Sequence, residues 1–507
     1  MSGSEGANQK DAIRFILDGE VITVTDVDPT RTVLQYLRED LGRTGTKEGC
    51  AEGDCGACTV ALVDLDRSGS RLQVRAVNSC IQFLPTLDGR ELITVESLSG
   101  ADGALHPVQA AMVDCHGSQC GFCTPGFVMS LFAQFKNSSN PTRREIDDAL
   151  AGNLCRCTGY KPIVDAARKM YESPGAKPRD WMRTCDGASS EPLADEKNKV
   201  AAIKALDNGL SLSIAKDDRR FYAPVSIAEF AELLETFPEA TVLAGGTDIG
   251  LWVTKQHKQL QTIIYTGKVA GLADISADDD TIEIGAAATL SDAMPVLDEH
   301  YPQLHDLFTR FASPPIRNAG TLGGNVANGS PIGDSMPALL VLDASLVLRK
   351  GTATRALPLD QFYLGYQQNA LTGGEFVERI RIPRLAGDSV LRSFKVSKRF
   401  DQDISAVCGA YWLRLEKGAV RDVRIAYGGL AAIPQRAVET EKLLHGEQWN
   451  ESSVRAAMAK LASDFQPISD MRSTAGYRMR VCQNLLYRFW LETSGQNVAT
   501  DVYNYGR

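Results

Sequence analysis

Basic charge is in short supply in this sequence of 507 residues. Lys and Arg together number 54 against 63 Asp and Glu, which leaves a formal charge of −9, and neither end of the chain carries a basic run. Proteins that bind the phosphates of nucleic acid or an anionic membrane usually present an excess of positive charge. The composition therefore gives no electrostatic reason to expect nucleic acid or a membrane as partner.

Long apolar runs are also missing. The first residues, MSGSEGANQKDAIRF, lack a basic stretch followed by an apolar core, and even the apolar segment ALLVLDASLVL is interrupted by Asp343. We therefore expect neither a secretory signal nor a transmembrane span, and we interpret the protein as cytoplasmic. With 44% hydrophobic residues the chain can bury several cores, which predicts two to four domains.

Cysteine is scarce in the second part of the chain. Ten of the twelve cysteines fall within the first 185 residues. In a reducing compartment thiols stay free or bind metals rather than form disulfides. The distribution predicts a metal-binding part followed by a part with different chemistry.

The first group of cysteines lies in a glycine-rich loop between expected strands. Residues 12–24 and 59–77 show strand patterns and residues 31–42 show helical spacing, so we expect a small mixed sheet with one helix across it. The thiols follow C-x4-C-x2-C-x21-C, the plant-type ferredoxin spacing for a [2Fe-2S] cluster. The predicted ligands are Cys50, Cys55, Cys58 and Cys80.

A structural zinc site is the alternative for this loop. Zinc usually takes two C-x2-C pairs or added histidines, and the loop has neither. Gly49, Gly53 and Gly56 would let the backbone wrap a cluster and point amides at its sulfurs.

A second group of cysteines lies within residues 106–172, which show helical periodicity and no strand alternation. The thiols follow C-x2-C-x31-C-x-C, with Pro125 placed in a first helical turn. Taken alone, the C-x-C pair is less diagnostic than the spacing of the first group, because two cysteines separated by one residue also occur in zinc and thiol-exchange sites. The predicted ligands are Cys120, Cys123, Cys155 and Cys157.

Composition changes after the second group. Residues 173–218 are rich in Pro, Gly, Ser and charge, which indicates an exposed connector. Beyond it, residues 243–250 (LAGGTDIG) and 317–344 contain glycine-rich turns, and such turns can present free backbone N–H groups to a diphosphate. The first turn is not a G-x-G-x-x-G, so a Rossmann fold is disfavoured.

The motifs GSQCGFCTPG and GNLCRCTGY, after a ferredoxin-like domain, resemble the molybdenum hydroxylases. The resemblance covers almost the whole chain and implies a multidomain α+β fold with two [2Fe-2S] clusters and FAD. The implied parts are a β-grasp ferredoxin-like [2Fe-2S] domain (11–98), a helical-bundle [2Fe-2S] domain (99–172), a linker (173–218), a vanillyl-alcohol-oxidase-type FAD domain (219–388) and an α+β flavoprotein C-terminal domain (389–507).

The two glycine-rich stretches resemble the family's FAD loops, which grip the diphosphate and ribityl chain. By that resemblance the first loop comprises Leu243, Ala244, Gly245, Gly246, Thr247, Asp248 and Ile249. The second supplies Thr321, Gly324, Asn325 and Asp334, and further flavin-contact positions are Phe311 and Lys395. Gly246 and Asp248 stand where family members often carry Asn and Glu, which leaves those side-chain roles open.

Residues 395–405 resemble the loop beside the flavin ring, where a nicotinamide must dock. Charges there control access of an anionic cofactor, and the candidates are Arg399 and Asp403. The resemblance further implies that Gln119 and Cys157 face a molybdopterin held by a partner. The implied assembly is a heterotetramer of two small and two large chains.

The implied function is that of the small subunit of a bacterial xanthine dehydrogenase. Electrons from xanthine or hypoxanthine oxidation to urate, a step of purine catabolism, would pass from molybdopterin through two clusters to FAD and then to NAD+. No acid, base or nucleophile of this chain need touch the purine. Two alternatives stay open: service to another hydroxylase, for aldehydes or N-heterocycles, and a stand-alone diaphorase-like electron-transfer protein.

Overall fold

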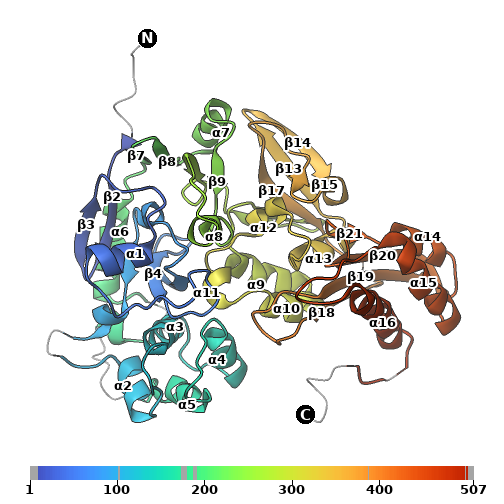
Figure 1. Cartoon of the computed structure of the whole chain (residues 1–507), viewed down its shortest axis with the longest axis horizontal. Helices are drawn as coiled ribbons and strands as arrows, with labels where there is room; N and C mark the ends of the chain where they lie inside the picture. The colour runs from blue at the N-terminus through green and yellow to red at the C-terminus, as the bar shows by residue number, and fades with distance from the viewer. Residues whose placement is uncertain are drawn as a thin grey trace. The chain divides into compact units, whose positions relative to one another are not determined.

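The computed structural model describes residues 9–100, 103–172, 180–185, 191–385, 387–496 and 498–500 (Figure 1). The chain forms two compact units, and each is described by itself. The first unit comprises Met1–Gly271 and Ser313–Gly320, and the second comprises Leu272–Ala312 and Thr321–Arg507. The segment predicted as the FAD domain, residues 219–388, is shared between them.

The first sheet of the first unit is mixed and five-stranded, in the order β3-β2-β6-β4-β5. Its strands are β2 (Ile13–Leu17), β3 (Glu20–Val24), β4 (Thr59–Leu65), β5 (Leu72–Asn78) and β6 (Glu91–Ile93). Asp18 and Gly19 both have positive φ, as the two-residue turn between β2 and β3 requires. One helix, α1 (Val33–Gln35), continues as a π-helical turn (Tyr36–Asp40) and buries Leu37 against the sheet. The expected mixed sheet with one helix is confirmed.

Four helices follow: α2 (Pro107–Asp114), α3 (Thr124–Asn137), α4 (Arg143–Leu150) and α5 (Lys161–Lys169). Pro125 lies in the first turn of α3, as predicted. Helix α3 contacts both its helical neighbours and strands β4 and β5, so Phe127 and Phe132 are fully buried. The helical bundle and the ferredoxin-like sheet therefore share one apolar core.

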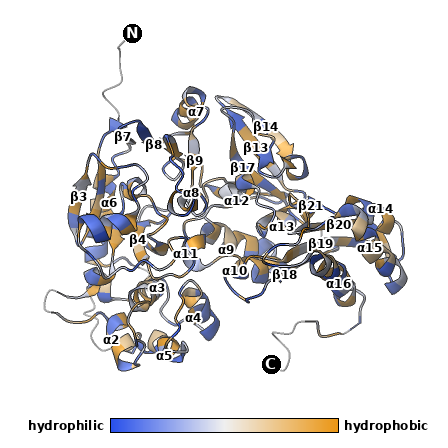
Figure 2. Ribbon diagram, in the orientation of Figure 1, coloured by the Kyte–Doolittle hydropathy of each residue, from blue (hydrophilic) through white to orange (hydrophobic). Residues whose placement is uncertain are grey.

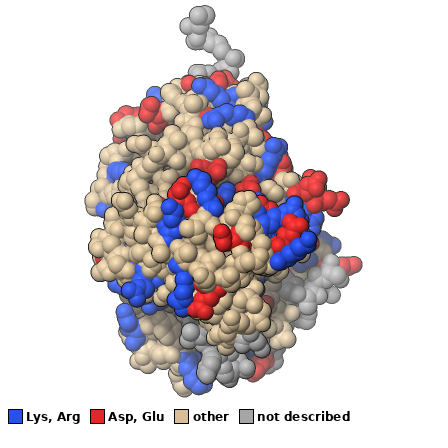
Figure 3. Space-filling view, turned by 90° about the vertical axis from the view of Figure 1, so that its right-hand side faces the viewer, with Lys and Arg blue, Asp and Glu red and all other residues tan. Residues whose placement is uncertain are grey.

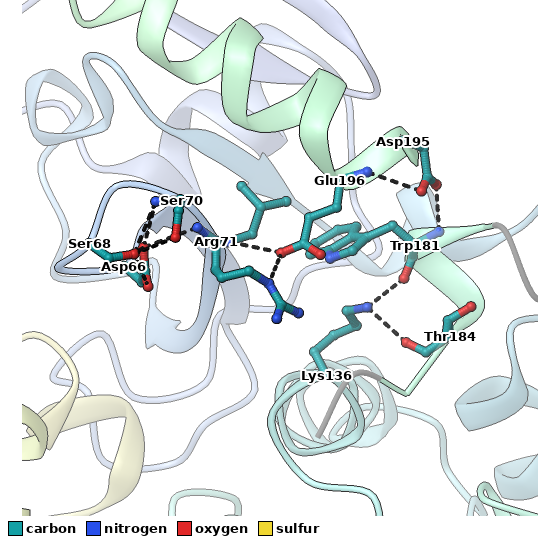
Figure 4. Close-up of polar contacts among 10 residues, drawn as sticks. Asp66, Ser68, Ser70, Arg71, Lys136, Trp181, Thr184, Asp195 and Glu196 are labelled. Carbon is teal, nitrogen blue, oxygen red and sulfur yellow. Dashed lines mark hydrogen bonds and ion pairs between the residues drawn. The ribbon is translucent and has the colours of Figure 1, made fainter. Parts of the chain in front are cut away.

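The predicted connector is only partly exposed. Its residues 173–179 and 186–190 lie outside the described residues, but helix α6 (Ala194–Leu206) packs on β2, β4 and β5. The expectation of an exposed segment is wrong here because Trp181 and Glu196 are each 1% exposed. Glu196 pairs with Arg71, and Lys136 of α3 donates to the carbonyl oxygen of Trp181 (Figure 4). These buried polar pairs fix residues 180–185 and 191–206 against the rest of the first unit, and composition alone does not reveal them.

A second five-stranded sheet completes the first unit, in the order β1-β7-β8-β10-β9. Its strands are β1 (Gln9–Lys10), β7 (Ser211–Lys216), β8 (Arg219–Ala223), β9 (Thr241–Leu243) and β10 (Thr262–Tyr265). Helix α7 (Ile227–Thr236) precedes β9, and α8 (Ile249–Thr254) follows it. The first glycine-rich stretch is the turn from β9 into α8. The short helix α11 (Pro314–Arg317) also belongs to this unit.

The second unit begins with a sheet in the order β11-β12-β17-β13-β14. Its strands are β11 (Ile275–Ala277), β12 (Thr281–Gly285), β13 (Ser345–Lys350), β14 (Ala353–Pro358) and β17 (Phe376–Pro383), with a hairpin of β15 (Tyr363–Gly365) and β16 (Gln368–Asn369). The helices of this part are α9 (Leu290–His300), α10 (His305–Arg310), α12 (Leu322–Asn328) and α13 (Ser335–Val341). The second glycine-rich stretch enters α12 and continues to α13.

The C-terminal part of the second unit is an antiparallel sheet with three helices. The strands are β18 (Ser389–Val396), β19 (Val407–Glu416), β20 (Ala419–Gly428) and β21 (Gln435–Arg436), and the helices are α14 (Val438–Leu444), α15 (Glu451–Asp464) and α16 (Ala475–Thr493). These helices carry both hydrophilic and hydrophobic residues (Figure 2), as helices with one buried face do.

Charges of both signs are interspersed on the face of the molecule shown in Figure 3. In the C-terminal helices, exposed residues of opposite charge pair one helical turn apart, such as Arg455 with Glu451 and Lys442 with Glu439. Within the described ranges, no helix combines the length and the apolar character that a bilayer crossing requires.

Candidate functional site

The loop of the first cysteine group has no regular structure and depends on glycine. Gly53 and Gly56 have φ angles of +80° and +70°. A Cβ on Gly56 would lie 2.1 Å from the carbonyl oxygen of Gly152. Position 56 therefore requires glycine for its backbone conformation and for space.

The four thiols of the first group come together. The backbone N–H of Cys55 donates to Sγ of Cys50 at 3.3 Å. Hydrogen bonds from the thiols of Cys55 and Cys80 lower the pKa of Cys50, and a hydrogen bond from Cys80 lowers that of Cys58. The same hydrogen bonds raise the pKa of Cys55 and Cys80, so two of the four thiols favour the thiolate form that binds metals and the other two favour the protonated form.

The four thiols of the first group form a chain of contacts from Cys55 through Cys50 and Cys80 to Cys58. Among the described residues, no group of three or more His, Cys, Asp or Glu side chains gathers closely enough to hold a single metal ion. Zinc needs its ligands around one ion, whereas a [2Fe-2S] cluster spreads four thiolates over two irons. Four thiols are the donor set that a [2Fe-2S] cluster requires.

The second group of cysteines lies at the N-terminal end of α3 and after α4. Cys123 is the residue before the first turn of α3, and burial raises its pKa to about 12. Its thiol lies beside that of Cys155, and the thiol of Cys120 lies beside that of Cys157. The backbone N–H of Cys157 donates to Sγ of Cys155 at 3.4 Å. The structure therefore brings the four predicted ligands together as two pairs of thiols from separate segments.

This second site reaches the protein surface. Gln119, Cys120 and Cys157 are exposed, in contrast to Cys58 and Cys80 of the first group, which are buried. An exposed group can exchange electrons with a partner chain, and a buried one cannot do so as directly. Of the four remaining cysteines, Cys408 and Cys482 are buried, whereas Cys115 and Cys185 are only partly buried.

The first glycine-rich turn packs closely against the backbone of another segment of the first unit. A Cβ on Gly245 would lie 1.8 Å from the carbonyl oxygen of Ala319, and Gly246 has a φ of +72°. Asp248 is partly buried, which raises its pKa. In the part of the chain that the structure describes, the backbone N–H groups of residues 244–248 donate no hydrogen bond. Free amides in a tight turn can bind an anionic group such as a diphosphate.

From Thr321 onward the second glycine-rich stretch belongs to the second unit, and this part begins with a helix cap. Thr321 Oγ1 accepts from the N–H of Gly324 at 2.9 Å. Asn325 Oδ1 accepts from the hydroxyl of Ser335 at 2.6 Å. Asp334 and Lys395 form a buried ion pair, so the two charges neutralise each other. Phe311, which ends α10, packs against the apolar core of this unit.

The two candidates of the NAD-access loop bind each other. The backbone N–H of Arg399 donates to Asp403 Oδ2 at 2.7 Å, and its guanidinium donates to the carbonyl oxygen of Gln402 at 3.1 Å. More than half of the Arg399 side chain is exposed. These contacts fix the shape of the loop and leave the guanidinium open to solvent on one side.

Two residues near this loop were not predicted from the sequence. Arg310 stacks over the ring of Phe400 at 4.4 Å and donates to the carbonyl oxygen of Lys395 at 3.2 Å. Gln402 has a φ of 53°, and both polar atoms of its side chain are buried without a partner. No sequence signal marks either residue, because a single Arg or Gln without a motif is common on surfaces.

Four family models match consecutive parts of the chain. The first two describe a 2Fe-2S iron-sulfur cluster binding domain (residues 15–83) and a [2Fe-2S] binding domain (residues 94–168). The others describe an FAD binding domain in molybdopterin dehydrogenase (residues 215–385) and a CO dehydrogenase flavoprotein C-terminal domain (residues 392–493). The chain therefore contains two [2Fe-2S] domains and an FAD-binding domain.

Curated relatives match over nearly the whole chain. Xanthine dehydrogenase of Emericella nidulans is 32% identical and the match covers 96% of this chain but 39% of the relative. Xanthine dehydrogenase 1 of Arabidopsis thaliana is also 32% identical, with 91% of this chain and 38% of the relative covered. The chain thus spans about two fifths of the length of these relatives.

Solved structures match about half of the chain. Carbon monoxide dehydrogenase from Hydrogenophaga pseudoflava is 27% identical with a TM-score of 0.51, covering 53% of this chain and 94% of the solved one. Reconstituted carbon monoxide dehydrogenase from Oligotropha carboxidovorans is 28% identical with a TM-score of 0.50 and the same coverage.

Proposed function

We propose that this chain is the electron-transfer subunit of a xanthine dehydrogenase. The premise is that its domains are those of the iron-sulfur and FAD portion of a molybdenum hydroxylase. The carrying observation is the match to xanthine dehydrogenases over 96% and 91% of the chain. The proposed reaction is oxidation of xanthine or hypoxanthine to urate by a partner, with NAD+ as the final acceptor.

The chain's proposed task is to hold and order its cofactors. When bound, the clusters carry single electrons and FAD exchanges an electron pair as hydride with NAD+. Cys50, Cys55, Cys58 and Cys80 would hold the first cluster and exclude water from it, since Cys58 and Cys80 are buried. Cys120, Cys123, Cys155 and Cys157 would hold the second, which the exposed Cys120 and Cys157 bring to the surface.

The proposed FAD-binding residues are those of the two glycine-rich stretches, where free backbone amides and a helix cap support the proposal. The N–H groups of Gly246 and Thr247 would bind a phosphate, since they donate no hydrogen bond among the described residues. Thr321, Gly324 and Asn325 would form the second loop in the cap of α12. The buried Asp334–Lys395 ion pair would stabilise that loop, and it would not present an unpaired charge to FAD.

The proposed partner is a molybdopterin-binding chain, in a heterotetramer of two small and two large chains. Gln119 and Cys157 would face the molybdopterin, because both are exposed beside the second group of thiols. In the nicotinamide loop, Arg399 would attract the anionic dinucleotide while Asp403 holds the loop in shape.

A second candidate is service to a hydroxylase with another substrate. The similarity of about half the chain to carbon monoxide dehydrogenases favours keeping this candidate, since related flavin domains occur with different partners. Substrate choice would then reside in the partner chain. A stand-alone diaphorase would instead purify from its host without any molybdenum-containing chain.

To test this proposal, this chain is produced together with a molybdopterin-binding chain from the same host. Iron, sulfide, flavin and molybdenum are quantified, and NADH formation is followed with xanthine, an aldehyde and an N-heterocycle. Two irons per cluster domain, one FAD and xanthine-dependent NADH support the proposal. Oxidation of an aldehyde or N-heterocycle with xanthine untouched would reject xanthine and keep the electron-transfer role.

A further inference from the structure

The two cysteine-rich loops of the first unit touch each other directly. The backbone N–H of Leu154 donates to the carbonyl oxygen of Cys55 at 3.0 Å. Leu154 is followed in the chain by Cys155. One hydrogen bond and a few covalent bonds therefore connect a predicted ligand of the first group with a predicted ligand of the second.

The side chain of Asn153 lies beside this bond and is 2% exposed. Its Nδ2 donates to the carbonyl oxygen of Gly56 at 3.0 Å and to Oγ1 of Thr59 at 3.3 Å. Its Oδ1 accepts from the hydroxyl of Ser130, a residue of α3, at 2.6 Å. Both ends of the carboxamide are thus bonded, and buried polar groups bonded in this way have a fixed orientation.

The backbones around Asn153 are in close contact. A Cβ on Gly126 would lie 2.1 Å from the carbonyl oxygen of Gly56, and a Cβ on Gly56 would lie 2.1 Å from that of Gly152. At these distances neither Gly56 nor Gly126 could be replaced by a residue with a side chain without moving the backbone. The placement of the two loops therefore depends on backbone hydrogen bonds and on the Asn153 carboxamide.

We propose that Asn153 is a positioning residue for electron transfer between the two clusters. By binding Gly56, the neighbour of Cys55, it holds the carbonyl of Cys55 where the N–H of Leu154 reaches it. The two sets of cysteines would hold the clusters, and these would supply the transfer of one electron from the second group's cluster to the first group's. No bond forms or breaks and no proton moves. The inference rests on the proposed function, since both groups must bind clusters.

The test variant is Asn153→Asp in the full chain with its partner. A carboxylate keeps the size and still accepts from Ser130, but it cannot donate to Gly56. We expect both clusters to remain by iron content and low-temperature electron paramagnetic resonance. The rate of electron equilibration between clusters after flash reduction should fall about 10- to 100-fold, as for other residues that orient metal ligands. The magnetic coupling between the two reduced clusters should also change.

The matched control is Asn137→Asp. Asn137 is also an asparagine of the helical part, and its Nδ2 donates to the carbonyl oxygen of Val74 in the ferredoxin-like sheet at 2.8 Å. It joins the same two parts of the chain, away from the cysteines. Its variant should keep the equilibration rate and the coupling of the unmodified protein.

Unchanged rate and coupling in Asn153→Asp with both clusters present would overturn the inference. An equal loss in Asn137→Asp would also overturn it, because any contact between the two parts would then suffice. If Asn153→Asp loses a cluster, the variant Ser130→Ala is tested in its place, because it removes only the hydrogen bond to Asn153 Oδ1. A loss of electron-transfer rate smaller than the about 10- to 100-fold expected above would support the inference, and an unchanged rate would reject it. Unmodified protein without two distinct clusters would instead refute the ligand sets of the proposed function.

Discussion

The side-chain amide of Gln82 donates a hydrogen bond to the carbonyl oxygen of Gly245 at 3.0 Å. Gln82 follows Cys80 by two residues, and Gly245 lies in the first glycine-rich turn. The same contact area includes Gly250, where a Cβ would lie 2.8 Å from the carbonyl oxygen of Ile81. The first cysteine group and the turn proposed to bind FAD are therefore parts of one packed arrangement in the first unit.

Gln82→Leu is expected to weaken flavin binding and leave both clusters in place. The leucine fills the space but removes the donor to the partly buried carbonyl of Gly245, which costs at most about 1–3 kcal/mol, the range for a fully buried group. That cost falls on the turn whose free amides are proposed to hold the diphosphate. Flavin retention after gel filtration, with iron content measured in parallel, checks the prediction.

The control for this variant is Gln109→Leu. Gln109 also donates its side-chain amide to a backbone carbonyl, that of Val95, at 3.2 Å. Its loss should lower thermal stability without releasing flavin. Equal flavin loss in both variants would show that the effect comes from general destabilisation.

Gly56→Ala should abolish assembly of the first cluster. The residue has a positive φ and its Cβ would lie 2.1 Å from a backbone oxygen that cannot move aside cheaply. Gly69→Ala is the matched control, because Gly69 has a φ of +66° and its nearest neighbour would lie 4.0 Å away. The control should lose about 1–2 kcal/mol from backbone strain alone. Iron content and thermal unfolding distinguish the two, and full iron in Gly56→Ala would contradict the argument.

Lys395→Met should destabilise the second unit by about 3–5 kcal/mol, because it leaves a buried carboxylate without its cation. Asp334 and Lys395 are 3% and 2% exposed in their side chains. The double variant with Asp334→Asn should recover part of the loss, since neither charge is then unpaired. Urea unfolding followed by tryptophan fluorescence measures the effect.

Arg414→Met provides the comparison for a surface pair. Arg414 bonds to the exposed Asp388, and such pairs contribute little. If Lys395→Met released flavin without changing the urea midpoint, Lys395 would be a direct flavin ligand rather than the counter-ion of Asp334.

His106 makes the helical part sensitive to acid. Its Nδ1 accepts from the N–H of Val108 at 3.2 Å, and Nε2 lies 2.7 Å from the carbonyl oxygen of Met182. The neutral ring can satisfy both contacts with one proton on Nε2, but a second proton on Nδ1 would face an N–H group. Burial lowers the pKa of His106 to about 4, and the nearby charges of Lys136 and Arg183 act in the same direction.

Stability should therefore fall as the pH decreases from about 6.5 to about 4, because the unfolded chain binds a proton that the folded one refuses. Above this window the contribution is complete, and across it about 3 kcal/mol is lost. His106→Asn keeps a capping side chain that does not titrate, so its thermal midpoint should depend less on pH in this range. An identical pH dependence in the two proteins would contradict the assignment.

Cysteine and glycine spacing made much of the molecule predictable. The intervals between Cys50, Cys55 and Cys58 indicated one site before any fold was considered, because short loops leave few ways to place three thiols. Local patterns likewise predicted the strands around Asp18 and Gly19 and the first-turn position of Pro125. Each of these features depends on contacts within a few residues.

The tertiary structure alone decided the contacts between distant segments. Polar composition around residue 190 indicated a connector, yet Glu196 is buried because Arg71, which is 125 positions away, binds it. Nothing local distinguishes Asn153 from any other asparagine in a loop, and its role appears only when Gly56 and Ser130 lie beside it. The sequence by itself therefore determined the chemistry of the sites, while packing determined which backbone groups meet, since that depends on pairs far apart along the chain.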